Sequence, residues 1–229
     1  MSNPDIATRL ETVRLQIRAA ALAAGRDAAS VRLVAVSKTV AEEAVRCALA
    51  AGQRDFGENQ VQELCRKAAL LPSDCTWHLI GHLQGNKVRQ AVRLAAWIHT
   101  VDSVALLERI ERLAAAEGRR PNVLLQVNIS GETGKFGAAP EAVEAILGRA
   151  LTCTHLTCCG LMTMAPFGAT EVQLRQVFGG LRRCRDHLQN RCGAVLPELS
   201  MGMSGDFASA IREGATLVRL GTAIFGPRT

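Results

Sequence analysis

The chain has 229 residues, of which 48% are hydrophobic and 21% charged, a balance that argues against a disordered chain. Its formal net charge of +6 comes from scattered basic residues, mostly arginine, and aromatic residues make up only 3%. A nucleic-acid-binding surface would group its basic residues, so nucleic acid is not an expected partner. No signal sequence and no run of roughly 20 apolar residues is present, so we expect a cytoplasmic protein without membrane contact.

Eight cysteines are spread along the chain. They form no C-x-x-C pair and have no zinc-type spacing with histidine, so no metal site is expected. Several fall on the faces of expected helices, where a free cysteine behaves as a small hydrophobic residue. We therefore expect reduced, structural thiols rather than disulfides.

The first expected element is a helix over residues 4–24. Its apolar residues repeat with the period of a helix and share one face: Ile6, Leu10, Val13 and Ile17. Pro4 suits the first turn of a helix and Gly25 is a typical end signal. Whether this helix closes one end of the domain or packs on its side is left open by the sequence.

Eight short strand-like runs then alternate with helical segments. The runs cover residues 31–36, 54–57, 77–80, 97–101, 123–129, 156–161, 198–200 and 217–220. The helical segments cover residues 41–51, 59–70, 86–95, 103–117, 140–150, 170–190 and 206–213. Such alternation predicts parallel strands joined by crossover helices.

Eight such units favour an α/β fold in which residues 1–229 form a single (β/α)8 barrel of TIM type, with the opening helix as an extra element. The alternative is a doubly wound open sheet. That fold normally has a glycine-rich turn after its first strand. Here Ser37, Lys38 and Thr39 follow the first strand, without a glycine, so the barrel is the preferred prediction.

Lys38 is the first candidate for chemistry. It directly follows the apolar, β-branched run of residues 31–36, and the C-terminal ends of barrel strands are where active sites lie. Partial burial would disfavour its ammonium form and leave the free amine that forms a Schiff base with a carbonyl. A lysine that only reaches solvent from the end of a strand is the alternative interpretation.

Asn59 follows the second strand, where it could orient a ligand or serve as the N-cap of the next helix. The polar, glycine-containing loop 81–87 follows the third strand and could line the mouth of the barrel. His78 and His82 are too isolated to form a metal pair, and we interpret both as structural.

The loops after the seventh and eighth strands are rich in small and hydroxyl residues. Ser204 lies in the first of them, and Gly221 and Thr222 lie in the second. These two loops usually form the phosphate site of such barrels, because backbone N–H groups gather there. The last strand of a closed barrel adjoins the first, so Lys38 would lie next to this phosphate site. An aldehyde that carries a phosphate fits both features.

Seven motifs along the whole chain now point to one family. They are LVAVSKT (33–39), FGENQVQE (56–63), WHLIG (77–81), LQGNK (83–87), GLMTM (160–164), LSMGMS (199–204) and VRLGTAIFG (218–226). In this order the sequence resembles the pyridoxal phosphate homeostasis proteins, single-domain relatives of the alanine racemase barrel.

The resemblance implies pyridoxal 5′-phosphate as the cofactor, held as a Schiff base on Lys38. It implies that the phosphate contacts Ser204, Gly221 and Thr222. It also implies that Asn59 lies beside the cofactor ring and that Arg219 faces the pyridine nitrogen. An arginine can only donate hydrogen bonds, so it would keep that nitrogen unprotonated and weaken the ring as an electron sink.

Two positions depart from the family pattern. The family usually has a tyrosine after the equivalent of Asn59, where this chain has Gln60, and it more often has a small residue where this chain has Phe136. Neither position belongs to the lysine or to the expected phosphate loops. Both could change the mouth of the site.

Three functions fit a phosphate site beside a Schiff-base lysine. The preferred one is a cofactor-binding protein of intracellular pyridoxal phosphate homeostasis, without turnover, which could exchange cofactor with pyridoxal-phosphate-dependent apoenzymes. The second is an amino-acid racemase, but racemases of this barrel type use a tyrosine from a second domain, and this chain contains no tyrosine. The third is a phosphosugar aldolase, for which no carboxylate stands close to Lys38 in sequence. A monomer is expected.

Overall fold

The computed structural model describes residues 4–132, 134 and 136–227. Within them, eight parallel strands close into a barrel in which each strand pairs with the next and β8 pairs with β1. The strands are β1 (Arg32–Val36), β2 (Asp55–Glu58), β3 (Thr76–Leu79), β4 (Trp97–Val101), β5 (Asn122–Gln126), β6 (Thr157–Met162), β7 (Glu198–Ser200) and β8 (Leu217–Leu220). The expected barrel is therefore confirmed, with strand ends shifted by up to three residues.

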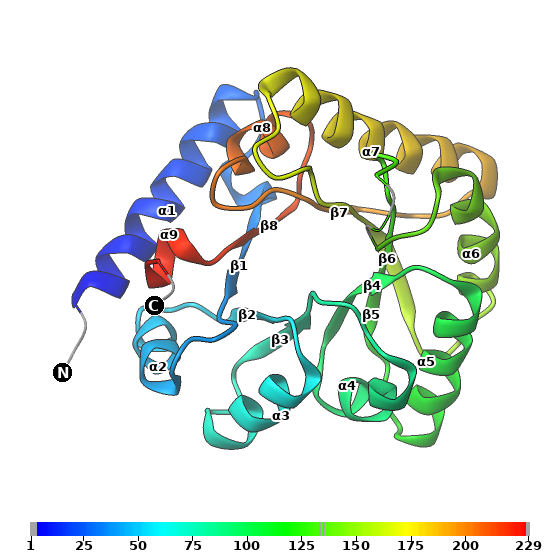
Figure 1. The fold of residues 1–229 in the computed structure, drawn as a ribbon, viewed down its shortest axis with the longest axis horizontal. Helices are drawn as coiled ribbons and strands as arrows, with labels where there is room; N and C mark the ends of the chain where they lie inside the picture. The colour runs from blue at the N-terminus through cyan, green and yellow to red at the C-terminus, as the bar shows by residue number, and fades with distance from the viewer. Residues whose placement is uncertain (1–3, 133, 135, 228–229) are drawn as a thin grey trace.

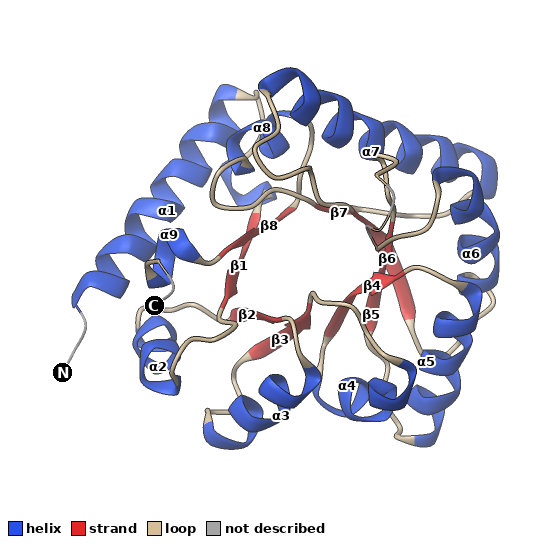
Figure 2. Ribbon diagram, viewed as in Figure 1, coloured by secondary structure: helices blue, strands red, loops and turns tan. Residues whose placement is uncertain are grey.

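The helices surround this ring of strands (Figure 2). They are α1 (Pro4–Ala23), α2 (Glu42–Ala50), α3 (Val61–Leu70), α4 (Val88–Leu94), α5 (Val104–Ala116), α6 (Val143–Ala150), α7 (Glu171–Cys192), α8 (Phe207–Arg212) and α9 (Thr222–Phe225). Short 3-10 turns cover Ala28–Ser30, Gly85–Lys87 and Pro140–Ala142. The four-residue α9 had no periodic signal in the sequence. Among the described residues, no helix has the length and apolarity needed to cross a membrane.

The opening helix α1 packs on the side of the barrel, along α8 and α9 (Figure 1). The apolar face expected from the sequence is buried there. Just after the helix, Arg26 donates hydrogen bonds to the carbonyl oxygens of Ile211 and Ala215, at 2.9 and 2.8 Å. The helix therefore covers the side of the barrel near β8 and β1, and it closes neither end of the barrel.

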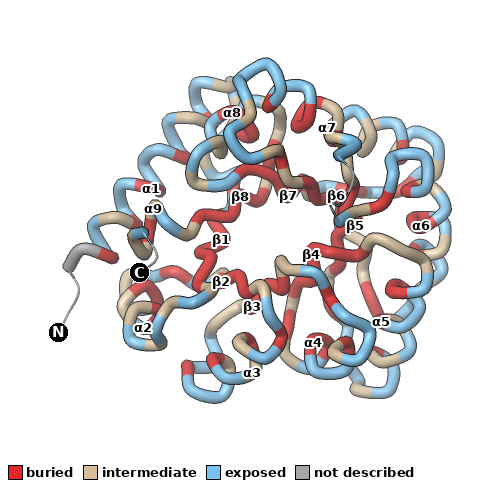
Figure 3. Tube along the Cα trace, in the orientation of Figure 1, coloured by how far each residue is buried: buried red, intermediate tan, exposed pale blue. Residues whose placement is uncertain are grey.

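Two apolar cores stabilise the barrel, and the inner ring is buried (Figure 3). The larger core lies between the strands and the helices. The smaller one includes Val34, Trp97, Leu124, Met162 and Leu217, which alternate strand positions direct inward. The lumen is thus a packed core rather than a pore, which is usual for an eight-stranded parallel barrel.

The eight cysteines are all free and partly buried. Each packs against one of the two apolar cores. Burial raises the pKa of Cys158 to about 12 and that of Cys159 to about 11, so both thiols stay protonated at neutral pH. These environments match the structural role expected from the sequence.

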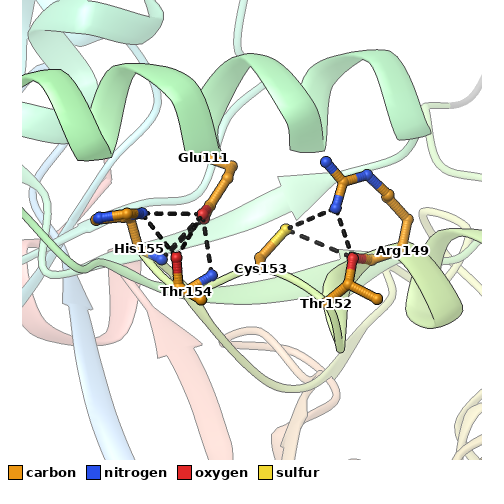
Figure 4. Close-up of polar contacts among 6 residues, drawn as sticks. All are labelled: Glu111, Arg149, Thr152, Cys153, Thr154 and His155. Atoms are coloured by element: carbon orange, nitrogen blue, oxygen red, sulfur yellow. Dashed lines mark hydrogen bonds and ion pairs between the residues drawn. The ribbon is translucent and has the colours of Figure 1, made fainter.

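A carboxylate holds the connection that leads into β6. Glu111 of α5 accepts hydrogen bonds from the backbone N–H groups of Thr154 and His155 and from the side chains of both (Figure 4). Beside it, the Arg149 guanidinium contacts the Thr152 hydroxyl. Burial alone would raise the pKa of Glu111, but these hydrogen bonds outweigh it and lower the pKa below the usual value. The ionised carboxylate therefore fixes the start of β6.

Replacing Glu111 with alanine should lower the free energy of unfolding by about 0.5–1.5 kcal/mol, because it removes the acceptor of two exposed backbone N–H groups, which then bind water. Urea denaturation followed by circular dichroism measures this loss. The control is Glu108→Ala, which removes a more exposed carboxylate on the same helix that pairs with Arg149. Equal stabilities for the two variants would contradict the role assigned to Glu111.

Candidate functional site

A cavity of about 640 Å3 opens at the C-terminal ends of the strands. This size is typical of small-molecule sites. All six site residues expected from the sequence line it: Lys38, Asn59, Ser204, Arg219, Gly221 and Thr222. They come from four separate stretches of the chain, after β1, after β2, after β7 and at the end of β8. Barrel closure therefore brings the candidates into one site.

Lys38 reaches the cavity because of the alternation of side chains along β1. Val34 lies in the inner core and Val36 lines the cavity, so Lys38 continues the inward-facing row. The strand pairs with β8 in the register Val34 to Arg219 and Ala35 to Leu220. This register sets the partly buried Lys38 beside the loop that begins at Gly221.

Asn59 lies at the cavity wall and does not cap a helix. Helix α3 begins at Val61 with Gln60 as its N-cap residue, so the N-cap interpretation of Asn59 is wrong. Gly81, in the loop after β3, packs directly on the Asn59 backbone. A Cβ on Gly81 would lie 2.2 Å from the Asn59 carbonyl oxygen, so only glycine permits this contact. The contact fixes where Asn59 meets the cavity.

The loops after β7 and β8 meet at the same end of the cavity. The backbone N–H of Ala223 donates to the Ser204 hydroxyl at 3.4 Å and joins the two loops. A Cβ on Gly221 would lie 3.2 Å from the Val36 carbonyl oxygen, so the loop packs tightly on the end of β1. Small residues thus leave backbone donors and two hydroxyl groups around one open space, which suits a phosphate.

Arg219 forms part of the cavity floor, where its side chain is nearly fully buried. It donates to the Ser200 hydroxyl at 2.6 Å and to the Thr163 carbonyl oxygen at 3.0 Å. Burial lowers the pKa of Arg219 to about 10, which the charge of Asp206 partly opposes. The guanidinium therefore remains protonated at neutral pH and acts only as a donor.

A chain of hydrogen bonds runs from Arg219 through the lumen to Asp55. Ser200 Oγ contacts His99 Nδ1 at 2.9 Å, and His99 Nε2 contacts His78 Nδ1 at 2.9 Å. His78 Nε2 then contacts Asp55 Oδ1 at 2.9 Å. Both imidazoles are fully buried, and His78 stacks on Trp97. We call these five residues, Arg219, Ser200, His99, His78 and Asp55, the polar chain.

With both imidazoles neutral and Asp55 ionised, one arrangement of protons satisfies the polar chain. A carboxylate oxygen accepts, so His78 Nε2 donates to Asp55 and His78 Nδ1 accepts from His99 Nε2. His99 Nδ1 then accepts the Ser200 hydroxyl proton, and the Ser200 oxygen accepts from Arg219. Both imidazoles are neutral, consistent with burial lowering the pKa of His78 and of His99. The interpretation of His78 as structural agrees with these contacts.

Further cavity residues carried no clear signal in the sequence. Asp206 lies in the same loop as Ser204, where burial raises its pKa and its carboxylate accepts a hydrogen bond from the backbone N–H of Met203. His82 also lines the cavity and stacks on Phe136, with ring centroids 4.2 Å apart. The departure at Phe136 therefore does change the mouth, and His82 lies at the site rather than in the core. Gln60 does not appear among the lining residues.

The part of the chain that the structure describes contains no cluster of metal ligands at this cavity. Over residues 4–132, 134 and 136–227, no group of three or more His, Cys, Asp or Glu side chains could hold a metal ion. The charged groups that line the cavity in this part of the chain are Lys38, Asp206 and Arg219. The site therefore offers an amine, a buried guanidinium donor and a set of small-residue loops.

Comparison with known proteins identifies the family. Residues 10–229 match the family model of the alanine racemase N-terminal domain. A pyridoxal phosphate homeostasis protein of Pseudomonas aeruginosa is 44% identical over 224 residues, which are 97% of this chain and 96% of that protein. The chain belongs to the pyridoxal phosphate homeostasis protein family. A member of the family from Aquifex aeolicus is 40% identical over 96% of this chain and 97% of its own length.

A solved family member has the same fold. The PipY protein of Synechococcus elongatus, in a structure without PLP, is 43% identical and superimposes with a TM-score of 0.89 over 96% of this chain and 100% of its own. A second structure of PipY, with PLP bound, gives a TM-score of 0.86 at 42% identity with the same coverage. The family resemblance stated from the sequence is thereby confirmed.

The neutral histidines of the polar chain should make the protein less stable in mild acid. Both folded-state pKa values lie below the ordinary value of about 6.5, so the unfolded chain binds more protons and stability is lost as pH falls below that value. Between pH 7.5 and 5.5 the expected loss from the two groups is about 1–3 kcal/mol. Urea denaturation at both pH values measures it. A His99→Gln variant that kept the full pH dependence would contradict this assignment.

Proposed function

We propose that this chain binds pyridoxal 5′-phosphate, holds it as a Schiff base on Lys38 and acts in cofactor homeostasis. The observation that carries the proposal is the convergence of Lys38, Arg219 and the loops with Ser204, Gly221 and Thr222 on one cavity. An amine beside a phosphate cradle in one cavity matches an aromatic aldehyde phosphate. The proposed domain is the whole chain, residues 1–229, working in the cytoplasm as a monomer.

The residues present fit the cofactor. A Cβ at Gly221 would crowd the Val36 carbonyl oxygen, so glycine keeps the proposed phosphate loop packed close to β1. In this proposal Ser204 and Thr222 orient the phosphate with their hydroxyl groups, and Asn59 lies beside the ring. When bound, the cofactor supplies an aldehyde carbon for the Lys38 amine and a ring that can withdraw electrons.

Arg219 favours binding of the cofactor without catalysis. Hydrogen bonds to the Ser200 hydroxyl and the Thr163 carbonyl oxygen fix the Arg219 guanidinium, and Arg219 also lines the cavity. A protonated arginine that donates to the pyridine nitrogen keeps this nitrogen unprotonated. The ring is then a weak electron sink, and carbanion chemistry such as transamination is disfavoured.

A racemase is the alternative function, and the site supports it less well. A two-base racemase needs a second proton-transfer group opposite the lysine, and the chain contains no tyrosine to supply it. His82 lines the cavity but stacks on Phe136. A phosphosugar aldolase needs acid–base groups near Lys38, and Asp206, the lining carboxylate, belongs to the phosphate end. We therefore propose no turnover.

The relatives support the cofactor assignment. The proteins of Pseudomonas aeruginosa and Aquifex aeolicus are named for pyridoxal phosphate homeostasis, and one PipY structure has PLP bound. PipY has the same fold as this chain, and the two structures match over nearly their full lengths. The proposed partners are the cofactor itself and apoenzymes that depend on it, to which a reversible Schiff base would release it.

Lys38→Ala should abolish covalent attachment. The wild-type protein, mixed with pyridoxal phosphate and desalted, should show a visible absorption band, and borohydride followed by peptide mass spectrometry should locate the added mass on Lys38. The variant should lack both, because no other described lysine lines the cavity. Lys87→Ala is the matched control and should behave as the wild type. A colourless wild type, or a band that survives in Lys38→Ala, would refute the proposal.

The loaded protein should not exchange the α-proton of an amino acid. Incubation with L-alanine in deuterium oxide, followed by chiral chromatography and mass spectrometry, should give neither D-alanine nor deuterium incorporation above the level of free cofactor. The weak electron sink disfavours loss of the α-proton, and two-base racemisation also lacks its second base. Accumulation of D-alanine at a catalytic rate would favour the racemase instead.

A further inference from the structure

A buried lysine lies on the outer side of the barrel wall, directly behind Lys38. Lys67 of α3 is fully buried between this helix and the ends of β1 and β2. Its ammonium group donates to Glu58 Oε1 and Glu63 Oε1, both at 2.8 Å, and to the Ser37 carbonyl oxygen. An ammonium has three donors, so all three are used. We call Lys67, Glu58 and Glu63 the clamp.

The clamp contacts the backbone on both sides of Lys38. Before it, Ser37 is held twice, through its carbonyl oxygen by Lys67 and through its hydroxyl group, which donates to Glu58 Oε1 at 2.6 Å. After it, the backbone N–H of Thr39 donates to Glu63 Oε1 at 2.7 Å. The single residue between these anchors is the proposed cofactor lysine.

The turn that the clamp holds is strained. Thr39 has a φ of +62°. Among the residues that the structure describes, no other non-glycine residue has a positive φ. A β-branched residue in this left-handed conformation costs about 1–2 kcal/mol, so neighbouring contacts must hold it there. The bond from Thr39 to Glu63 is such a contact. Without it, the backbone after Lys38 would relax toward the ordinary region and turn the lysine side chain.

None of the clamp residues lines the cavity. Lys38 faces inward, so its neighbour Ser37 faces outward, toward α3. Glu58 and Lys67 are both fully buried on this outer side, and the second oxygen of Glu58 has no partner. Such a buried group of charges is an expensive arrangement, and replacing it by apolar side chains often leaves a protein as stable or more so. Stability alone does not account for the clamp.

We infer that Glu58, Lys67 and Glu63 are positioning residues for Lys38, which fix the turn at Ser37–Thr39 and thereby aim the lysine amine at the carbonyl carbon of the ligand. The inference rests on the proposed function of Lys38. Bond formation needs the reacting atoms aligned at about 3–3.5 Å, and a misplacement of about 1 Å lowers the rate by up to about 100-fold. The clamp therefore acts on the rate of Schiff-base formation more than on the non-covalent affinity.

The test compares two glutamates, of which only Glu63 accepts a hydrogen bond from the backbone beside Lys38. Glu63→Ala frees the Thr39 N–H. Glu42→Ala is the matched control, because Glu42 also pairs with a basic residue of α3, Arg66, and its side chain is 17% exposed against 15% for Glu63. The conservative variant Glu63→Gln keeps an oxygen acceptor for Thr39. Ser37→Ala probes the other anchor by removing one hydroxyl group, a change small enough to keep the fold.

Two quantities are measured for each protein. Stopped-flow absorbance gives the rate constant for covalent attachment of pyridoxal phosphate, and calorimetry gives the affinity for pyridoxine 5′-phosphate, which lacks the aldehyde. Glu63→Ala should attach the cofactor about tenfold more slowly, and Ser37→Ala about threefold more slowly. Affinity for the analogue should stay within about twofold in both. Glu63→Gln should recover most of the rate, and Glu42→Ala should match the wild type.

The inference fails if Glu63→Ala and Ser37→Ala attach the cofactor at the wild-type rate. It also fails if rate and analogue affinity fall together, because the clamp would then support the cavity in general. If Glu63→Ala does not fold, Ser37→Ala decides by the same criteria, and Glu63→Gln should still attach the cofactor at close to the wild-type rate. A wild type without attachment would refute the proposed function itself, an outcome separate from a failure of the clamp.

Discussion

Closure of the barrel between β1 and β8 is the constraint on which the candidate site depends. Four residue pairs set this register, from Arg32–Leu217 to Ala35–Leu220. In an open sheet with the same strand order, β1 and β8 would lie at opposite edges, about 30 Å apart at the usual strand spacing. Closure instead makes them neighbours, so that the amine of Lys38 and the loop at Gly221 open into the same cavity. The cores on both faces of the sheet stabilise this closed form.

The predicted site residues that line the cavity are those whose signal in the sequence is local. An apolar run that ends in a lysine indicates a strand end at Lys38, and small residues near Ser204 and Gly221 indicate loops with open backbone donors. Alternation of short and long periodic segments indicates the barrel, since parallel strands need crossovers. The start of α3 was predicted two residues too early, at Asn59 instead of Val61, because several polar residues there resemble N-caps.

The parts that the sequence did not predict depend on contacts between distant residues. His99 and Ser200 are 101 residues apart, and only strand order and register bring them together. The sequence of α3 does not indicate that Lys67 is buried, because lysine is normally exposed. Its burial follows from two carboxylates, one of which, Glu58, belongs to a strand. Pairing of this kind has no periodicity and no fixed spacing, so it appears only when the fold is known.

The direction of the polar chain has a consequence for which substitutions this protein tolerates. Each member is a donor to one neighbour and an acceptor from the other, and the order is set at both ends by groups that have a single role, the carboxylate of Asp55 and the guanidinium of Arg219. A substitution at His78, His99 or Ser200 that reverses one bond leaves two donors or two acceptors face to face in a dry lumen. In this chain, Arg219 at the floor of the cavity is therefore coupled to the four other positions, and replacing it alone would leave the Ser200 oxygen without its donor.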